Sequence, residues 1–323
     1  MPNDARLLLL DKNQVESLLR PDEVLQAVRE AFAQHSEGWG RIFPLVKEPL
    51  AAGNAFSIRS GDVLADGLLG LKAAGFWPRN REHGRETHQA TILMIDPAIG
   101  RPLCVIDGNA VTTLRTGAAG ALGLIHLARS DSSRLCLFGA GAQARIQLDY
   151  ALRVLPDLRH VAYVTASLKR DVIFEAHFAR RCHISHATDR NAAVAESDVV
   201  ITATPGAGAL FEVDAVRPGT HLNCVGADTK GKRELPEGLL AKSRLFVDDC
   251  IQARQIGETQ WATDTPCTEL GDLITGKAQA MRQSMDITIF DMTGIALQDL
   301  AVARLLRERA NEANVGSSVA WSC

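Results

Sequence analysis

The sequence lacks the features that mark membrane-spanning and secreted proteins. No apolar run reaches the ~18–20 residues that cross a bilayer. The first four residues, Met1 to Asp4, include an acidic residue. The basic segment and following apolar stretch of a secretory signal are not found in the sequence. A cytoplasmic protein is therefore expected.

Concentrated positive charge is also absent. The chain has 35 Lys and Arg against 38 Asp and Glu, a formal net charge of −3, and no block of basic residues. Nucleic acids and anionic membranes bind clusters of Lys and Arg, so neither is an expected partner.

Paired cysteines are missing as well. The seven cysteines are scattered from Cys104 to Cys323 and contain no CxxC pair. Reduced thiols in a cytosolic protein fit this pattern best. His183 and His186 lie beside Cys182, but no second ligand pair accompanies them, so no metal site is expected.

What is present is an ordinary globular composition, with 46% hydrophobic and 23% charged residues over 323 positions. This length favours two domains. In the first third, Pro21–Ser36 has the apolar spacing of an amphipathic helix. Apolar segments separated by turns then predict a largely antiparallel sheet, with strands at Ala55–Ile58, Leu68–Lys72, Ala90–Ile95 and Pro102–Ile106.

After a helical stretch at Thr112–Arg129, short apolar runs alternate with helical patterns. This alternation predicts βαβ units and a parallel sheet. Its strands are expected at Leu135–Phe138, Val161–Val164, Val199–Thr202, His221–Val225, Leu245–Val247 and Ile287–Phe290. A last helix, Ile295 to Glu312, is expected to pack back on the first domain. The expected domains are residues 1–118 with 296–323, and residues 119–295.

A glycine-rich turn follows the strand Leu135–Phe138. Gly139 permits a tight turn, Gly141 lets the backbone approach a pyrophosphate, and Ala144 allows close packing of helix on strand. The alternative is an ordinary βα turn. Because a strand precedes the motif and a helix pattern follows it, we expect an α/β protein in which a Rossmann dinucleotide-binding domain accompanies a discontinuous α+β domain.

The acid that usually holds the ribose 2′-hydroxyl of NAD is missing. The second strand ends at Val164 and is followed by Thr165, Ser167, Lys169 and Arg170, with no carboxylate among them. Two cations there would favour the 2′-phosphate of NADP. The alternative is that Lys169 and Arg170 are only solvated charges.

The sequence resembles the ornithine cyclodeaminase/mu-crystallin family over nearly its whole length. The motifs that carry the resemblance are Gly70–Lys72, Ala90–Leu93, Thr113–Gly120, Gly139–Gln143, Thr202–Pro205, Gly226–Leu235 and Phe290–Gly294. The resemblance implies a homodimer, a bound nicotinamide cofactor, and a substrate domain made of the first third plus the final helix.

The resemblance also implies roles for individual residues. Arg41, Lys72 and Arg115 match residues that hold the substrate carboxylate, and Asp228 matches the catalytic carboxylate, with Lys72 as a second catalytic candidate. The candidate cofactor-binding residues are Thr91, Arg115, Gly139, Gly141, Ala142, Gln143, Ser167, Arg170, Thr202, Thr204, Val225, Lys232 and Thr293.

These roles agree with the chemistry of the side chains. Arginine grips a carboxylate through two charge-assisted hydrogen bonds, and we place Arg115 near its helix start, where the dipole favours an anion. Lys72, at the end of an apolar strand, needs an anionic partner or loses its proton. Asp228 follows an apolar strand, at the sheet edge where open α/β folds bind ligands. Alternatively, Arg41 is a surface charge, and Asp228 shapes a turn or caps a helix beginning near Glu234.

The family catalyses at least two kinds of reaction. One is reduction of cyclic ketimines, such as pyrroline- or piperideine-2-carboxylate, or interconversion of an amino acid and its keto acid. The other is ornithine cyclodeamination with tightly held NAD, which needs an acid for the distal ammonium. Here that segment offers Ser57 at the place where the acid is expected, and Arg59 would repel an ammonium. Asp62 is the one candidate acid.

The missing ribose acid and Arg59 both favour the redox reaction, with NADP favoured over NAD. A non-catalytic small-ligand binder of mu-crystallin type is a further alternative. A pure binder has no need of Asp228, which argues against it. His88 lies three residues before Thr91, and either a site role or a surface position fits it.

Overall fold

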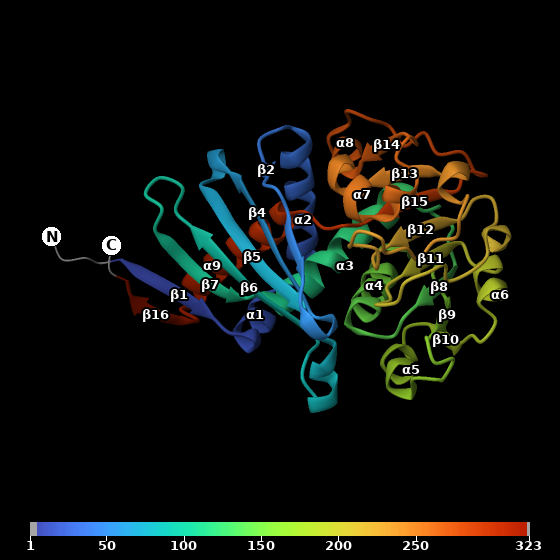
Figure 1. Cartoon of the computed structure of the whole chain (residues 1–323), viewed down its shortest axis with the longest axis horizontal. Helices are drawn as coiled ribbons and strands as arrows, with labels where there is room; N and C mark the ends of the chain where they lie inside the picture. Colours follow the sequence, from blue (N-terminus) through green and yellow to red (C-terminus); the bar gives the residue numbers. More distant parts are fainter. Residues whose placement is uncertain (1–4, 322–323) are drawn as a thin grey trace. The chain divides into compact units, whose positions relative to one another are not determined.

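The computed structural model describes residues 5–321, and the chain divides into two compact units (Figure 1). Unit 1 comprises Met1–Arg115 and Ile295–Cys323, and unit 2 comprises Thr116–Gly294. Residues 1–4, on which the expectation about secretion partly depends, and Cys323 lie outside the described range.

Unit 1 is built on a mixed eight-stranded sheet. β4, β5, β6 and β7 pair antiparallel as expected, whereas β1 pairs with β7 in parallel and with β16 antiparallel. The strand order is β16 (Ser317–Ala320), β1 (Arg6–Leu10), β7 (Pro102–Asp107), β6 (His88–Ile95), β5 (Leu68–Phe76), β4 (Ala55–Val63) and β2 (Arg41–Ile42), with β3 (Val46–Pro49) paired to β4.

The last helix, α9 (Ala296–Ala313), covers one face of this sheet. It packs on β4, β5 and β6 and against α2 (Pro21–Ser36). Gly70 permits the close approach, because a Cβ there would lie 2.8 Å from Leu300 Cδ2. Two further helices are α1 (Lys12–Leu18) and α3 (Gly108–Leu127), of which α3 begins in unit 1 and ends in unit 2.

Two local expectations in this unit are wrong. β5 continues to Phe76, so Lys72 lies in the middle of a strand and not at its end. α3 begins at Gly108, where Asp107 accepts a hydrogen bond from the Asn109 backbone N–H at 3.1 Å. Arg115 is therefore well inside the helix, and the dipole of the first turn does not act on its ligand.

Unit 2 has an eight-stranded sheet whose paired strands are all parallel, which confirms the expected Rossmann-type α/β class. The strand order is β10 (His183–His186), β9 (His160–Val164), β8 (Arg134–Phe138), β11 (Val199–Thr202), β12 (His221–Cys224), β15 (Thr288–Asp291), β13 (Arg244–Val247) and β14 (Cys267–Glu269). The helices of this unit after α3 are α4 (Ala142–Val154), α5 (Val172–Phe178), α6 (Arg190–Ala195), α7 (Cys250–Ile256) and α8 (Leu270–Thr275).

The order in which strands are added to this sheet reverses between β8 and β11, although all the strands run parallel. β9 and β10 lie on one side of β8, and β11 and β12 lie on the other. In open parallel sheets ligands bind at the carboxyl ends of the strands at such a reversal. Phe138 and Thr202, the last residues of β8 and β11, mark this edge.

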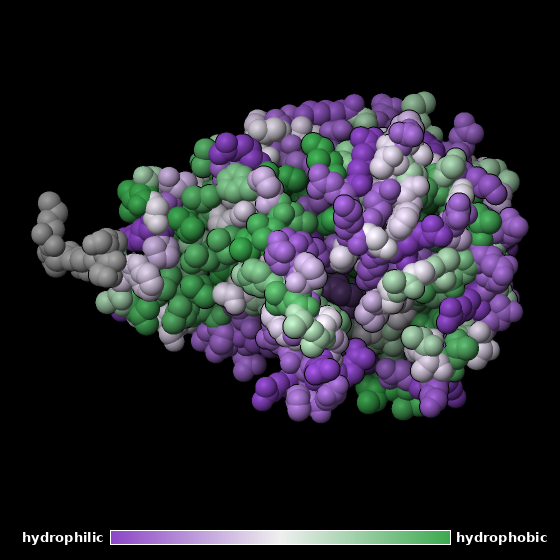
Figure 2. All heavy atoms as spheres, in the orientation of Figure 1, coloured by the Kyte–Doolittle hydropathy of each residue, from purple (hydrophilic) through white to green (hydrophobic). Residues whose placement is uncertain are grey.

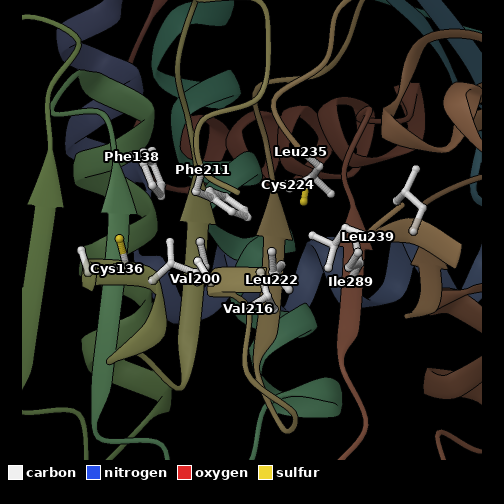
Figure 3. Close-up of a cluster of buried hydrophobic side chains, with 14 of the residues drawn as sticks. Cys136, Phe138, Val200, Phe211, Val216, Leu222, Cys224, Leu235, Leu239 and Ile289 are labelled. Atoms are coloured by element: carbon white, nitrogen blue, oxygen red, sulfur yellow. The ribbon is translucent and has the colours of Figure 1, made fainter. Parts of the chain in front are cut away.

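Two apolar clusters hold the sheet between its covering segments. Figure 3 shows one of them, in which Cys136, Val200, Leu222 and Ile289 project from four neighbouring strands. The other contains Leu135, Leu137 and Val161 with the α4 and α5 side chains packed on them. Within residues 5–321, no helix is both long enough and apolar enough to cross a membrane.

Candidate substrate and cofactor sites

A buried carboxylate in unit 1 gathers two of the three predicted substrate-binding cations. Asp299, in the first turn of α9, has a side chain that is 1% exposed. Lys72 Nζ donates to its Oδ1 at 2.7 Å, and Arg115 Nε donates to the same oxygen at 3.1 Å. The Asp299 cluster is the name used below for Asp299, Lys72 and Arg115 together with Arg59.

The secondary structure explains this convergence. Thr112 and Arg115 lie three positions apart on α3 and so share one face of the helix. Thr112 Oγ1 accepts from Lys72 Nζ at 3.2 Å, and Arg115 Nη1 donates to Gln298 Oε1 at 2.9 Å. Lys72 stands on the face of β5 that α9 covers, so it reaches the helix directly.

The electrostatics of the cluster leave Lys72 close to losing its proton. Burial lowers the pKa of Lys72 to about 7; the charge of Asp299 opposes this shift, and Arg115 and Arg59 add to it. Burial alone would raise the pKa of Asp299, but the charges of Lys72, Arg115 and Arg59 bring it below its ordinary value. Asp299 therefore remains a carboxylate, while the protonation of Lys72 responds to any further charge nearby.

Arg41, the third predicted clamp residue, lies elsewhere. Its side chain is 62% exposed and forms a two-point pair with Asp62, including Nε to Oδ1 at 2.9 Å. The β2–β4 register places the two residues opposite each other. Thr91, a predicted cofactor contact, is an exposed residue of β6. The structure thus brings together Lys72 and Arg115 but not Arg41.

His88 is partly buried at the start of β6. Its Nδ1 lies 3.2 Å from Asn109 Oδ1. The Asn109 amide nitrogen donates to the His88 carbonyl and to Glu86, which fixes the amide oxygen as the acceptor and assigns the proton to His88 Nδ1. Burial, reinforced by the charge of Lys72, lowers the pKa of His88 to about 4, so this imidazole is neutral.

The glycine turn of unit 2 has the geometry that a pyrophosphate requires. Gly139 has φ +112°, and a Cβ there would lie 2.6 Å from the Ala203 carbonyl oxygen. Gly141 is the N-cap of α4 and has open space around it. No side chain caps the first turn, which Ala142 and Gln143 begin, so its N–H groups are available to an anion.

Two buried polar atoms beside this turn support a bound dinucleotide. Gln143 Oε1 and Thr202 Oγ1 are buried and have no hydrogen-bond partner. Such atoms are normally satisfied, by protein, water or ligand. The residues present therefore fit a nicotinamide dinucleotide, with phosphates at Gly139–Gln143 and other polar groups toward Thr202.

The segment after β9 contains a carboxylate that the sequence analysis missed. Arg170 Nε donates to Glu175 Oε1 at 3.1 Å, and the Tyr163 hydroxyl donates to the same oxygen at 2.7 Å. Hydrogen bonds from Arg170 and Tyr163 lower the pKa of Glu175 to about 2. Ser167 and Lys169 are exposed beside it. The spacing offered no signal, because Glu175 comes from α5 and not from the end of the strand.

The remaining predicted cofactor contacts lie at or just beyond the carboxyl ends of the neighbouring strands. Lys232 Nζ donates to the Thr204 carbonyl at 3.1 Å, and Thr293 Oγ1 donates to Asp248 at 2.7 Å. Val225 follows β12 and donates its N–H to the Thr202 carbonyl at 2.9 Å.

Asp228 lies in the loop after β12. It is half-buried and accepts from Thr229 Oγ1 at 3.0 Å. No helix begins near Glu234, so Asp228 is not a helix N-cap.

Three buried acids in unit 2 also escaped the sequence analysis. Glu234, Glu258 and Asp291 are fully buried, and one oxygen of each has no hydrogen bond. Burial raises the pKa of Glu258 to about 8 and that of Asp291 to about 7. Asp291 is the last residue of the buried strand β15. An acid directly after apolar residues was the signal in the sequence that could have pointed to it.

Comparison with known proteins identifies the family of this chain. The family model described as the ornithine cyclodeaminase/mu-crystallin family matches residues 6–314. The chain belongs to this family.

Three relatives are similar over almost their full length. The iminosuccinate reductase of Paracoccus denitrificans is 32% identical, over 97% of this chain and 99% of that protein. The structure of an archaeal alanine dehydrogenase dimer with bound NAD has a TM-score of 0.92, 34% identity and coverage of 98% and 100% of the two chains. The Thermococcus litoralis Δ1-pyrroline-2-carboxylate reductase with NADH and L-proline has a TM-score of 0.90, 26% identity and coverage of 97% and 100%.

Proposed function

We propose that this protein is an NAD(P)H-dependent oxidoreductase of small imino and amino acids, acting as a ketimine reductase or an amino-acid dehydrogenase. The observation that carries the proposal is the Asp299 cluster, where Lys72 and Arg115 converge on a single buried carboxylate. The similar iminosuccinate reductase, alanine dehydrogenase and pyrroline-2-carboxylate reductase support the reaction class.

The cluster suits the carboxylate that imino, amino and 2-oxo acids share. Two cations on one acid leave an excess of positive charge, and burying such an excess is costly unless an anion accompanies it. A substrate carboxylate supplies that anion. Its arrival also favours the charged form of Lys72, whose pKa is only about 7 in the free protein.

The reaction requires one hydride and one proton. When bound, the nicotinamide supplies the hydride to the imine carbon, or accepts it from the amino acid in the reverse direction. We assign the proton exchange with the substrate nitrogen to Asp228, with Lys72 and Arg115 holding the carboxylate. Gly139, Gly141 and Gln143 hold the dinucleotide phosphates.

For the cofactor, we propose that NADPH is used at least as well as NADH. No acid follows β9 directly, and Lys169 and Arg170 are exposed there. The Arg170–Glu175 pair is formed at an exposed guanidinium, so Arg170 is able to exchange this partner for a 2′-phosphate.

Cyclodeamination is the less favoured reaction. Its distal ammonium needs an acid, and the one candidate, Asp62, is paired with Arg41. Arg59 in the same strand is a buried cation.

We further propose a homodimer in the cytoplasm, with unit 1 as the substrate-binding and dimerisation domain. Leu71, Leu93, Val105 and Leu9 are cross-strand neighbours in that order, and each is only partly buried. They stand on the sheet face opposite Lys72 and α9. Figure 2 shows hydrophobic residues gathered over the strands of unit 1 on the face in view. Six described cysteines carry free thiols, which suits a reducing compartment.

The test is a direct assay on the purified protein. Δ1-Pyrroline-2-carboxylate, and separately 2-oxo acids with ammonium, are incubated with NADPH or NADH while the nicotinamide absorbance is followed. Oxidation of the cofactor that depends on the imino acid is expected. If the cofactor binds but no imino acid is reduced and no amino acid is oxidised, the protein is a binder of mu-crystallin type.

A further inference from the structure

A short 3₁₀ helix in unit 2, η6 (Glu258–Trp261), lies against the segment that carries Asp228. This segment, Gly226–Leu235, is called the Asp228 loop below. It contains no helix or strand, so its position depends on contacts with other elements. Trp261 Nε1, for example, donates to the Lys232 carbonyl at 3.1 Å. The residues assigned to the reaction do not include any member of η6.

Gln260 holds the Asp228 loop through both ends of its side-chain amide. Its Oε1 accepts from the Gly231 N–H at 2.7 Å, and its Nε2 donates to the carbonyls of Thr229 and Lys232 at 3.3 and 3.2 Å. The backbone groups that they meet therefore assign the oxygen and the nitrogen of the amide. Nε2 also donates to the Gly257 carbonyl at 2.7 Å, which ties the side chain to the start of its own helix.

The contact with Thr229 reaches Asp228 through a single residue. Thr229 Oγ1 donates to Asp228 Oδ1 at 3.0 Å, and the carbonyl of the same threonine accepts from Gln260. The Lys232 N–H donates to this carbonyl as well, at 3.0 Å, and so closes a turn. Gln260 thus grips the turn that directly follows Asp228, and Thr229 links its amide to the carboxylate.

The helix η6 is itself anchored to the central sheet by buried acids. Asp291, the last residue of β15, accepts from the Thr259 N–H at 2.8 Å and from the Thr259 hydroxyl at 2.7 Å. Glu258 accepts from the Glu234 N–H at 2.7 Å, and Glu234 in turn accepts from the Thr204 N–H at 2.9 Å. The three acids are fully buried. The side chains of η6 therefore project from a support that is bonded to the sheet, which is what a residue that orients a catalytic group requires.

We propose that Gln260 is a positioning residue for the reaction, which holds Thr229 and thereby orients the carboxylate of Asp228. Its effect comes from geometry, because a misplacement of about 1 Å can cost about 100-fold in rate. This inference rests on the proposed function, in which Asp228 exchanges a proton with the substrate nitrogen.

The first experiment measures Gln260→Met, which keeps the length of the side chain and removes both hydrogen-bonding ends. We expect kcat for imino-acid reduction to fall by about 10- to 100-fold, while the KM of the imino acid changes by less than about threefold. The KM is preserved because Lys72 and Arg115, which hold the substrate carboxylate, are not members of the loop. An unchanged kcat overturns the proposal.

A double-mutant cycle tests whether Gln260 acts through Asp228. In the Asp228→Asn background, Gln260→Met is expected to lower kcat by less than about twofold, because the carboxylate that Gln260 orients is already gone. A residue that only stabilises the fold lowers activity equally in both backgrounds. Equal losses in the two backgrounds therefore overturn the proposal.

Gln260→Glu separates the two ends of the amide. It keeps an oxygen that accepts from the Gly231 N–H but loses the donor to the Thr229 carbonyl, so kcat should fall about as far as in Gln260→Met. If the Met variant does not fold, the Glu variant decides. A Glu variant with the wild-type kcat overturns the link through Thr229.

The matched control is Gln283→Met, the same substitution at an exposed glutamine of unit 2. It is expected to leave kcat unchanged. A control variant that loses as much activity as Gln260→Met shows that the loss does not come from the contacts of Gln260 and overturns the proposal.

Amide hydrogen exchange separates this inference from the proposed function. The Gly231 N–H donates to Gln260 Oε1, so its exchange should be about tenfold faster in Gln260→Met than in the wild-type protein. In Gln260→Glu, which keeps the acceptor, the exchange rate should stay near the wild-type value. This measurement needs no substrate.

The outcomes are distinct. If imino acids are reduced but kcat does not depend on Gln260, or depends on it equally without Asp228, the inference is wrong and the proposed function stands. If exchange at Gly231 responds as expected but no imino acid is reduced, the proposed function is wrong and Gln260 only holds the loop. If Asp228→Asn keeps the wild-type kcat, the oxidoreductase stands and the positioning role of Gln260 is overturned.

Discussion

At the scale of single residues, Asp228 provides the sharpest test of the proposed chemistry. If it exchanges the substrate proton, Asp228→Asn should reduce kcat by about 10²–10⁴-fold, the usual contribution of general acid–base catalysis, while leaving cofactor affinity nearly intact. Steady-state kinetics and a cofactor titration measure both quantities.

The alternative for Asp228 is a purely structural role in its loop. Asparagine fits turns as well as aspartate does, so the variant would then keep its activity. Activity of Asp228→Asn within roughly threefold of wild type, far below the loss expected of an acid–base group, would falsify the catalytic assignment.

Lys72 gives a prediction about pH. Its pKa of about 7 in the free protein lies below its ordinary value, so its charged fraction falls as the pH rises through 7. Because the charged form holds the substrate carboxylate, kcat/KM should decrease above about pH 7, approaching tenfold per pH unit.

The matched variant for this prediction is Lys72→Arg. A guanidinium does not titrate in this range, so the variant should lose the alkaline decrease even where its activity is lower. A wild-type kcat/KM that stays constant to about pH 9 contradicts the assignment.

The sequence predicted the need of Lys72 for an anionic partner but not the partner itself. A buried lysine in an apolar strand calls for a counter-charge, and this is a local statement. Asp299 is 227 positions away in sequence, in the last helix, so only the packing of α9 on β5 brings the two together. Arg41 was placed in the clamp by resemblance, whereas the structure pairs it with Asp62.

At the scale of elements, the segment joining β9 to α5 sets the cofactor preference. We predict that NADPH binds at least as tightly as NADH in a fluorescence titration. Arg170→Ala should weaken the binding of NADPH by roughly three- to tenfold, the size expected for one exposed charge pair. The binding of NADH should remain nearly unchanged.

The control here is Arg180→Ala, at an exposed arginine just after α5. It should affect neither cofactor. Tighter binding of NADH by tenfold, about 1.4 kcal/mol, overturns the preference and points to Glu175 as the ribose-binding acid.

Elements with a strong apolar pattern were predictable, and those without one were not. The central strands β11 and β12 are buried along their whole length, β8 is buried from Leu135 to Phe138, and all three were expected from their apolar runs. β16 consists of four exposed residues and β2 of only two, so neither has a pattern to detect. Their place in the sheet comes from backbone pairing with β1 and β4.

At the scale of the whole molecule, we predict a dimer formed through the uncovered sheet face of unit 1. Light scattering at micromolar concentration should give twice the mass of one chain. Leu93→Asp introduces a charge into the apolar row of that face and should shift the mass toward one chain, because burying an unpaired carboxylate is costly.

The control for the dimer is Ile173→Asp, at a 72% exposed residue of α5 in unit 2. It should leave the mass unchanged. A wild-type protein with the mass of one chain contradicts the prediction.

The way α9 completes unit 1 has a consequence for biosynthesis. Arg59, Lys72 and Arg115 are made early, whereas Asp299 follows Lys72 by 227 residues. At ~5–20 residues per second, this delay is roughly 10 to 45 s. Unit 2 ends at Gly294 and so leaves the ribosome before unit 1 is complete. Until the final helix is translated, the cations of the N-terminal part remain hydrated. The sheet face that α9 covers in the complete protein is then still exposed.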